Sequence, residues 1–281
     1  MAQDTVGAKP AGKGGQLMRT KFGQNFLVSQ SAAQKIASLC AGFKASHMVE
    51  VGPGKGFLTR ELLPYFSGRL TLIEIDPDMA LVLRERLGSE GFRLINADFM
   101  EADLAALLPP EGDIVFGGNL PYSVGSAILQ KALDFPRFCG GAMMFQKEVA
   151  LRICAKPGSE HYGVLSLASQ SRAECGLVFS LGPRQFNPPP KVDSAVVLFK
   201  KLPVPAYGDE SLKEHFFRAV KGSFAHRRKT IVNSLSTSLG LEKVEAERCL
   251  RESGIDPAVR AETVDLQSFV RLAGALRKTQ P

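Results

Sequence analysis

The sequence predicts an α/β protein in which a mostly parallel sheet of seven strands precedes a small all-α domain. Between residues 47 and 200, short apolar runs alternate with segments of helical periodicity. Beyond Pro203 and Pro205, which mark a linker, only helical periodicity remains. We therefore expect a flexible tail over residues 1–20, an α/β domain over 21–204 and a helical domain over 205–281.

Seven short apolar runs are the predicted strands. They are Met48–Val51, Leu70–Ile75, Arg93–Ile95, Asp113–Phe116, Ala142–Phe145, Leu177–Ser180 and Ala195–Lys200. At least one of the last two is expected to be antiparallel. Helices are predicted at about 31–40, 57–65, 77–87 and 162–170. Between the last two strands, the three consecutive prolines of Phe186–Val192 exclude both a helix and a central strand, so we expect an extended loop.

Three helices are predicted in the C-terminal domain, at about 211–235, 241–252 and 265–278. Ser211 and Glu214 have the spacing of a capping box, which predicts the start of the first helix. That helix carries the basic residues Lys221, Arg227, Arg228 and Lys229. A solvated face explains such a cluster, but its density also suits contacts with phosphates.

Composition excludes several classes of protein. Hydrophobic residues make up 44% of the 281-residue chain, which excludes a disordered protein, and no segment approaches 18 consecutive apolar residues. The first 24 residues lack the apolar core of a signal peptide, and their few arginines do not fit a transit peptide. The five cysteines are scattered singly, without the spacing of a metal site. We expect a cytoplasmic monomer that binds neither metal nor membrane.

The net charge of +7 is unevenly distributed along the chain. Residues 1–48 carry a net charge of +5, residues 49–150 carry −5, residues 151–200 carry +3 and residues 201–281 carry +4. An acidic centre between basic flanks is expected if the centre binds a small cationic or hydroxyl-rich ligand while the flanks contact a polyanion. Basic ends that only increase solubility would produce the same pattern.

The tetrapeptide Asn119-Leu120-Pro121-Tyr122, directly after the fourth predicted strand, has the chemistry of a site for a flat aromatic amine. Pro121 keeps Leu120 extended, so the Leu120 carbonyl stays available as an acceptor. The side-chain oxygen of Asn119 is a second acceptor, and the ring of Tyr122 can stack on a base. A Pro-Tyr turn that closes a βα unit would explain the same four residues.

Glycines and acidic residues follow the other strands. Gly52, Gly54 and Gly56 lie between the first strand and its helix, where the backbone must approach a ligand closely in a Rossmann-like sheet. Glu74 ends the second strand, where a carboxylate can accept both hydroxyls of a ribose, and Asp98 follows the third, where it can accept from an adenine amine. Because parallel strands end at one edge of the sheet, these residues should converge with Asn119.

The predicted ligand contains an adenosine and carries no phosphate. The glycine spacing departs from Gly-x-Gly-x-x-Gly, and no Gly-Lys-Ser/Thr follows, so neither a dinucleotide nor a nucleoside triphosphate is favoured. A mildly acidic pocket tolerates a positive charge on the ligand. S-adenosylmethionine fits this description, and NAD is the alternative.

Seven segments together resemble the ribosomal RNA adenine dimethyltransferases, in particular the bacterial small-subunit enzymes, over nearly the whole chain. They are Lys21–Leu27, Glu50–Gly56, Ile73–Asp76, Gly118–Tyr122, Phe186–Ser194, Arg227–Lys229 and Arg260–Thr263. The chain departs from the family in the run Ser123–Ser126, where Asn-Ile-Ser-Thr is typical, and in its longer N-terminal tail. Neither departure involves the residues of the expected chemistry.

The resemblance implies a class I methyltransferase fold and dimethylation at N6 of two adjacent adenines, in a hairpin loop near the 3′ end of 16S rRNA. The substrate would be the small ribosomal subunit or its precursor. The α/β domain would bind S-adenosylmethionine and the helical domain would bind RNA. The implied cofactor contacts are Asn25, Leu27, Gly52, Glu74, Asp98 and Asn119, and the glycine turn adds Gly54 to the expected contacts. The expected RNA contacts are Lys21, Lys191, Lys221, Arg227, Arg228 and Lys229.

In the expected mechanism, Asn119 and the Leu120 carbonyl accept the two N–H bonds of the adenine amine, and its lone pair then points at the methyl group. Tyr122 and, by resemblance, Phe186 would sandwich the base. Large-subunit rRNA methylation and a largely non-catalytic role in ribosome assembly remain alternatives. DNA adenine and protein glutamine methyltransferases use similar tetrapeptides, but a leucine in second position weighs against them.

Overall fold

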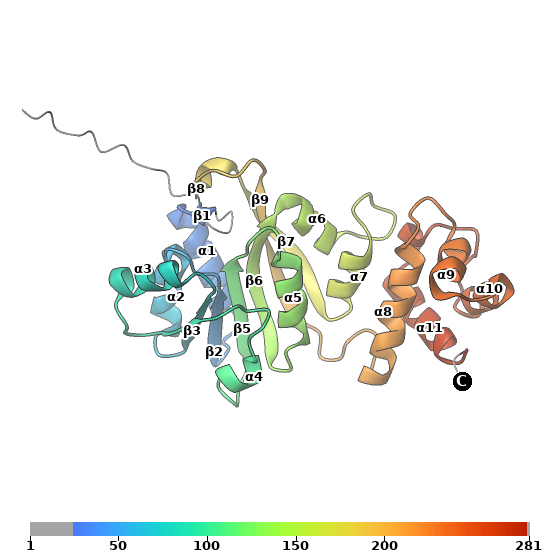
Figure 1. Cartoon of the computed structure of the whole chain (residues 1–281), viewed down its shortest axis with the longest axis horizontal. Helices are drawn as coiled ribbons and strands as arrows, with labels where there is room; N and C mark the ends of the chain where they lie inside the picture. Colours follow the sequence, from blue (N-terminus) through green and yellow to red (C-terminus); the bar gives the residue numbers. More distant parts are fainter. Residues whose placement is uncertain (1–24, 280–281) are drawn as a thin grey trace, which may run out of the picture.

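A seven-stranded sheet flanked by helices forms the main body of the protein, and a group of helices follows it along the chain (Figure 1). The structure is a computed structural model and describes residues 25–279. The tail predicted for residues 1–20 and the predicted RNA contact Lys21 lie outside the described residues. The strands of the sheet are β2 (His47–Val51), β3 (Leu70–Glu74), β4 (Arg93–Asn96), β5 (Ile114–Asn119), β6 (Phe138–Gln146), β7 (Ala173–Leu181) and β9 (Ser194–Lys201).

The strand order is β4-β3-β2-β5-β6-β9-β7. The first five strands in this order are parallel, and β9 is antiparallel to both of its neighbours. The predicted α/β class, with seven strands that are mostly parallel, is therefore confirmed. Because β2 pairs with β3 on one side and with β5 on the other, the strand order reverses at β2, and a ligand crevice is expected at their carboxyl ends.

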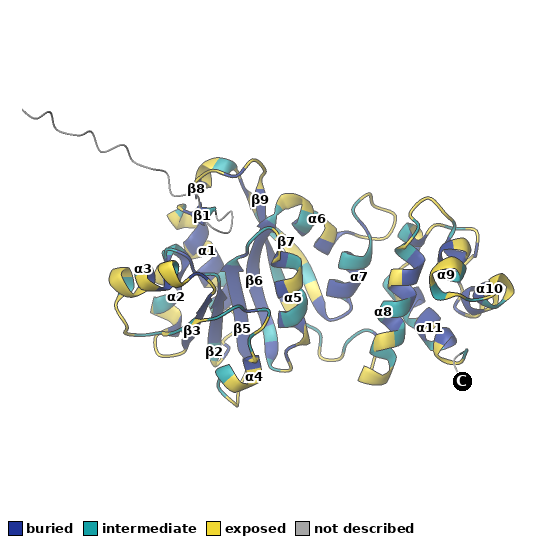
Figure 2. Ribbon diagram, viewed as in Figure 1, coloured by how far each residue is buried: buried dark blue, intermediate teal, exposed yellow. Residues whose placement is uncertain are grey.

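Alternate residues of the strands enter two separate cores. Met48 and Met144 pack with helices α1 (Gln30–Ala41) and α2 (Phe57–Phe66) on one face. Val49 and Met143 pack on the other face, where α5 (Gly125–Asp134) and α6 (Lys147–Cys154) lie. The edge strands β4 and β7 carry exposed residues, whereas β2, β3, β5, β6 and β9 are largely buried (Figure 2). Burial on both faces explains why these strands are continuous apolar runs in the sequence.

The remaining helices of the α/β part are α3 (Pro77–Leu87), α4 (Leu104–Leu107) and α7 (Val164–Gln170). The helices predicted near 31–40, 57–65, 77–87 and 162–170 are present as α1, α2, α3 and α7. No helix was predicted at α4, α5 or α6. In α5 the buried residues Ile128, Leu129, Ala132 and Leu133 have helical spacing, so the signal for that helix was present.

A second, two-stranded sheet covers the carboxyl ends of the large one. β1 (Phe26–Leu27) pairs antiparallel with β8 (Phe186–Asn187), and Val28 N–H donates to the Gln185 carbonyl at 2.8 Å. The loop expected over 186–192 thus begins with two paired residues, after a 3₁₀ turn at Pro183–Gln185. This pairing places the N-terminal segment, residues 25–28, beside the proline-rich loop.

The C-terminal helices are α8 (Glu210–Phe224), α9 (Ile231–Leu239), α10 (Lys243–Glu252) and α11 (Leu266–Arg277), with a 3₁₀ turn at Ala261–Thr263. The prediction of one helix over 211–235 is wrong, because the chain turns at residues 225–230. The buried Ser234 hydroxyl stabilises this turn: it donates to the Gly222 carbonyl at 2.8 Å and accepts from His226 N–H at 3.1 Å.

The predicted capping box at the start of this helix is also wrong. The N-cap is Asp209, whose side chain accepts from Leu212 N–H at 3.3 Å. A charged carboxylate is a stronger acceptor than a hydroxyl. Because Asp209 precedes Ser211 in the sequence, the helix begins earlier than the capping box predicted.

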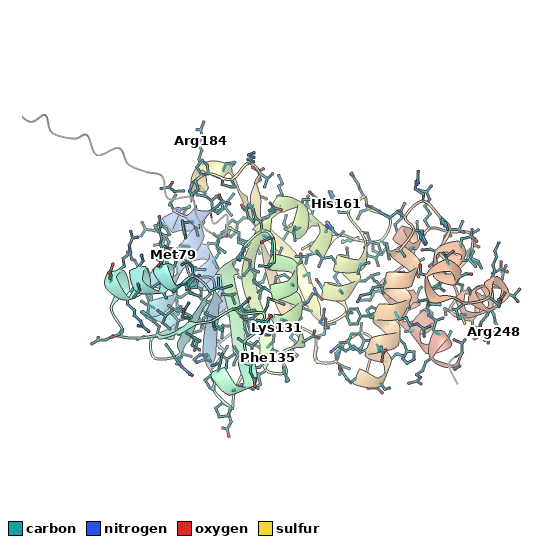
Figure 3. All side chains as sticks on the ribbon, viewed as in Figure 1. Met79, Lys131, Phe135, His161, Arg184 and Arg248 are labelled. Atoms are coloured by element: carbon teal, nitrogen blue, oxygen red, sulfur yellow. The ribbon has the colours of Figure 1, made fainter. Side chains whose placement is uncertain are left out.

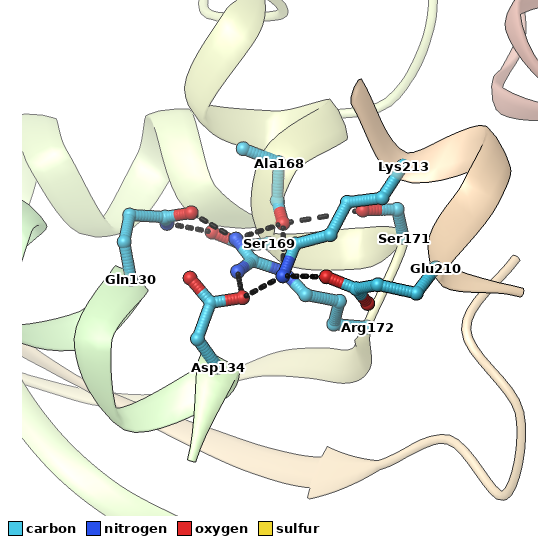
Figure 4. Close-up of polar contacts among 8 residues, drawn as sticks. All are labelled: Gln130, Asp134, Ala168, Ser169, Ser171, Arg172, Glu210 and Lys213. Atoms are coloured by element: carbon cyan, nitrogen blue, oxygen red, sulfur yellow. Dashed lines mark hydrogen bonds and ion pairs between the residues drawn. The ribbon is translucent and has the colours of Figure 1, made fainter. Parts of the chain in front are cut away.

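Polar contacts connect the C-terminal helices to the sheet domain (Figure 4). Arg172 is 5% exposed and donates to Asp134 at the end of α5 at 2.8 Å, and Lys213 of α8 lies 3.1 Å from the same carboxylate oxygen. Lys213 also pairs with Glu210 at 2.8 Å. The core of the C-terminal helices includes Tyr162 and Leu167 from the region of α7. The domain boundary at residue 204 stays a prediction.

Candidate active site

A cleft with a volume of about 280 Å³ lies at the carboxyl ends of β2, β3, β4 and β5. It brings together all the residues predicted to contact the cofactor, which are Asn25, Leu27, Gly52, Gly54, Glu74, Asp98 and Asn119. Leu120 and Tyr122 line the same cleft. The cleft occupies the point where the strand order reverses, so the topology of the sheet explains the convergence.

Glu74, at the end of β3, is 1% exposed, and both of its carboxylate oxygens accept backbone hydrogen bonds. Gly54 N–H donates to Oε2 at 2.9 Å and Asp76 N–H donates to Oε1 at 3.0 Å. Burial raises the pKa of this carboxyl, and the two backbone donors partly offset that effect. Each oxygen keeps a second lone pair, so the predicted contacts with two ribose hydroxyls fit the geometry.

Gly54 also has a local reason to be glycine. Its φ is +55°, and a Cβ at this position would lie 2.8 Å from the ring of Phe26 in the N-terminal segment. The ammonium of Lys55 lies 4.5 Å from the centroid of the same ring. The glycine turn therefore packs against the N-terminal segment as well as facing the cleft.

Asp98 lies directly after β4 and is half-buried. Its Oδ1 accepts from Met100 N–H at 2.7 Å, which folds residues 98–100 into a tight turn. Phe99 and Met100 line the cleft beside it and supply apolar surface. This combination of one carboxylate and apolar walls fits an adenine ring with its exocyclic amine.

Glu50 is a cleft residue that sequence reasoning did not single out. It lies within β2, is 1% exposed and accepts from the Thr59 hydroxyl at 2.7 Å. Burial raises the pKa of Glu50 to about 8, and the neighbouring Glu74 contributes in the same direction. A glutamate inside an otherwise apolar strand is the signal that could have identified it.

The side chain of Asn119 is oriented by the N-terminal segment. Its Nδ2 donates to the Asn25 carbonyl at 2.7 Å, across 94 residues of sequence. This bond directs the amide nitrogen toward Asn25, so Oδ1 is the end that can accept from a ligand in the cleft. Both residues were predicted at the site, but the bond by which Asn25 orients Asn119 was not.

The backbone around Asn119 is set by close packing and by proline. A Cβ on Gly118, whose φ is +156°, would lie 2.4 Å from the Val51 carbonyl oxygen, so only glycine allows β5 to approach β2 here. The following turn is closed by the Pro121 carbonyl, which accepts from Gly125 N–H at 2.8 Å. Within the described chain the Leu120 carbonyl accepts no backbone hydrogen bond, so it is available as an acceptor.

Tyr122 is half-buried, and its hydroxyl lies 2.8 Å from the hydroxyl of Ser194, the fully buried first residue of β9. Burial raises the pKa of Tyr122, and the bond to Ser194 opposes this effect. The contact fixes the far end of the tyrosine ring. Ser194 is the last residue of the proline-rich segment Phe186–Ser194, but no pattern in that segment indicated a hydrogen bond between Ser194 and Tyr122.

The structure does not place Phe186 in the cleft. Its side chain is 3% exposed and packs in the core on the α1 and α2 face, with Phe186 opposite Leu27 in the β1–β8 pair. Pairing with the N-terminal segment buries the ring, so it does not form a face of a base-binding site in this arrangement. The expectation that Phe186 stacks on the target base is not supported by its position.

A family model described as ribosomal RNA adenine dimethylase matches residues 15–278. The chain belongs to this family. A relative named ribosomal RNA small subunit methyltransferase A, from Cereibacter sphaeroides, is 42% identical over 260 residues, which is 91% of each chain. The resemblance inferred from the sequence motifs is therefore confirmed.

Two solved structures share the fold of this ribosomal RNA adenine dimethylase. A dimethyladenosine transferase from Plasmodium falciparum is 26% identical with a TM-score of 0.70, over 90% of this chain and 98% of that one. The 23S rRNA methyltransferase ErmE is 28% identical with a TM-score of 0.68, over 90% of this chain and 100% of that one. Both matches agree with the predicted methyltransferase fold.

Those predicted RNA contacts of this dimethylase that lie within residues 25–279 are outside the cleft, on separate elements. Lys191 is exposed in the loop between β8 and β9, and Lys221 is exposed in the last turn of α8. The exposed basic turn consists of Arg227, Arg228 and Lys229, between α8 and α9. Among residues 25–279, no three His, Cys, Asp or Glu side chains are grouped as a metal site requires, and no helix is long and apolar enough to span a bilayer.

Proposed function

We propose that this dimethylase transfers methyl groups from S-adenosylmethionine to N6 of two adjacent adenines in the 3′-terminal hairpin loop of 16S rRNA during small-subunit biogenesis. The observation that carries the proposal is a single cleft in which Glu74 and Asp98 face the tetrapeptide Asn119–Tyr122. Family membership and the small-subunit name of a 42% identical relative support the same substrate.

The charge of the cleft favours this cofactor over a dinucleotide. Glu74 and Asp98 line it, and among the described lining residues Lys55 is the one cationic side chain. The Lys55 ammonium is directed over the Phe26 ring, 4.5 Å from its centroid. A pyrophosphate would meet carboxylates here, whereas a ligand with a sulfonium and an ammonium group would be stabilised by them.

The tetrapeptide positions the nucleophile. An adenine amine is a weak nucleophile because its lone pair is delocalised into the ring. When Asn119 Oδ1 and the Leu120 carbonyl accept its two N–H bonds, the nitrogen becomes pyramidal and its lone pair points away from both acceptors. Bound S-adenosylmethionine supplies an electrophilic methyl group on a positively charged sulfur.

Charge disperses during this reaction, so correctly placed dipoles matter more than a strong base. The residues that line the described cleft include no His or Cys, in keeping with a mechanism that removes no proton before the attack. Asn119 is neutral, so the site places no full negative charge under the base. The Leu120 side chain is buried, which holds the backbone carbonyl of the same residue in place.

Tyr122 supplies one face of the base-binding site. Stacking of a base on an aromatic ring stabilises a complex by about 1–3 kcal/mol, and the bond to Ser194 keeps the ring in place before the base arrives. A base in a hairpin loop is already partly unstacked, so turning it into the cleft costs little.

RNA binding is proposed for the basic turn and for the loop that carries Lys191. In Figure 1, α8 runs from the linker toward the edge of the molecule on which β8 and the loop into β9 also lie. The basic turn at its end therefore lies toward the same edge of the molecule as β8 in this view. An RNA hairpin that inserts its loop into the cleft would extend its phosphates along this side.

Methylation of large-subunit rRNA is the second candidate, because the structure of ErmE, a 23S rRNA methyltransferase, has the same fold. Sequence identity favours the small subunit, at 42% against 28%. Labelled S-adenosylmethionine offered in parallel to unmethylated small subunits, naked 16S rRNA, 23S rRNA and duplex DNA decides between them. Labelling of 23S rRNA or DNA alone would overturn the proposal.

The mechanism is tested by Asn119→Ala. We expect methyl transfer to small subunits to fall below detection, because one of the two acceptors is lost, while S-adenosylhomocysteine still binds. Asn233→Ala, at an exposed position of α9, is the matched control and should keep full activity. Near-normal turnover by Asn119→Ala would contradict the mechanism. Loss of S-adenosylhomocysteine binding would instead show that the Asn119–Asn25 bond mainly closes the N-terminal segment.

A further inference from the structure

Lys131, on the helix α5 that follows the catalytic tetrapeptide, makes two hydrogen bonds to the segment that carries Asp98. Its Nζ donates to the carbonyl of Met100 at 2.7 Å and to that of Ala102 at 2.7 Å. The ammonium also lies 5.6 Å from the centroid of the Phe99 ring. Lys131 is half-buried and is labelled in Figure 3 near the middle of the sheet domain.

The segment that receives these bonds is held to the core by apolar packing, because Phe99 is 4% exposed and its ring meets that of Phe116 edge to face, with the centroids 6.2 Å apart. It follows β4, which is the edge strand of the sheet and has partly exposed residues. Within the segment, Asp98 accepts from Met100 N–H at 2.7 Å and its carbonyl accepts from Ala102 N–H at 2.9 Å. These two hydrogen bonds lie within the turn itself, so they do not orient its backbone relative to α5. Lys131 supplies the polar contacts between the backbone of the turn and α5.

The position of α5 gives the contact a role at the site. Ile128, one turn before Lys131, lines the cleft together with Phe99 and Met100. The same side of α5 thus supports the cleft wall and fixes the Asp98 turn. Hydrogen bonds from an ammonium are shorter and stronger than neutral ones, and two of them to carbonyls two residues apart restrict the turn in more than one direction.

We propose that Lys131 is a positioning residue for the cofactor, which arranges the Asp98 turn before the adenine ring enters. Lys131 does not touch the cofactor itself; it acts through the backbone of Met100 and Ala102. A turn arranged in advance loses less conformational entropy when the ligand binds, so Lys131 should increase the affinity for the cofactor. The inference rests on the proposed function, because it assigns the Asp98 side of the cleft to adenine.

The test uses the full-length protein with Lys131→Met, which removes the ammonium and keeps the length of the side chain. Titration calorimetry with S-adenosylhomocysteine should show a Kd raised on the order of tenfold, equivalent to about 1.4 kcal/mol. The turnover number at saturating S-adenosylmethionine and the Kd for RNA should not change. Lys131→Arg, which can still donate to both carbonyls, should restore most of the affinity.

Lys201→Met is the matched control, because Lys201 also donates to a backbone carbonyl, that of Pro136, away from the cleft. It should leave the Kd for S-adenosylhomocysteine unchanged. An unchanged Kd in Lys131→Met, or equal changes in the two methionine variants, would overturn the inference. Failure of the wild-type protein to bind S-adenosylhomocysteine would overturn the proposed function instead, so the two failures can be told apart.

Discussion

The buried glutamate of β2 makes the stability of this protein depend on pH in a defined direction. Glu50 is 1% exposed, and its pKa is raised from 4.5 to about 8, mainly by burial. Glu50→Gln is the perturbation of choice, because glutamine has nearly the same shape and its oxygen can still accept from the Thr59 hydroxyl. The variant removes the titration and keeps the packing.

The sign of the effect follows from proton binding. Between pH 4.5 and about 8 the folded protein keeps a proton on Glu50 that the unfolded chain has lost. The free energy of unfolding therefore decreases as the pH rises through this window. At about 1.4 kcal/mol per pH unit, a window of about 3.5 units corresponds to a loss of roughly 5 kcal/mol. Glu50→Gln avoids that loss.

Thermal unfolding of both proteins between pH 5 and pH 9 measures the difference. We expect similar melting temperatures near pH 5 and a variant that is more stable by on the order of 10 °C at pH 8.5. Glu74 is present in both proteins, so its contribution to the pH dependence is the same in each and does not affect the comparison. Glu90→Gln, at an exposed position, is the control and should follow the wild-type curve. Parallel pH profiles for Glu50→Gln and the wild type would refute the reasoning.

Two further predictions concern RNA. Replacing Arg227, Arg228 and Lys229 with glutamine should weaken RNA binding and flatten its salt dependence by up to about 0.7 log units per lost single-strand phosphate contact. Filter binding at several salt concentrations measures this, and an unchanged slope would assign these side chains to a solvated surface. Tyr122→Phe and Ser194→Ala each remove the same hydrogen bond, so both should raise the KM for RNA, and the double variant should be no worse than either. Additive losses would show that this bond does not orient the ring.

The sequence by itself determined the sheet and most of the positions at the site. Alternating apolar runs and helical segments predict parallel strands, and parallel strands bring their carboxyl ends to one edge. Glu74, Asp98 and Asn119 therefore converge in the structure as expected. The glycine turn was also evident, because only glycine suits the backbone there. The strands, the helices and the glycine turn can each be recognised from residues that lie close together in the sequence.

Only the tertiary structure decided how the site residues are oriented. Asn119 is fixed by the Asn25 carbonyl 94 residues away, and Tyr122 by Ser194 72 residues away. The stacking role expected for Phe186 lost its support because another segment covers that ring. Partners so distant in sequence leave no periodic pattern. Burial depends on what packs against a residue, and that is decided only when the whole chain has folded.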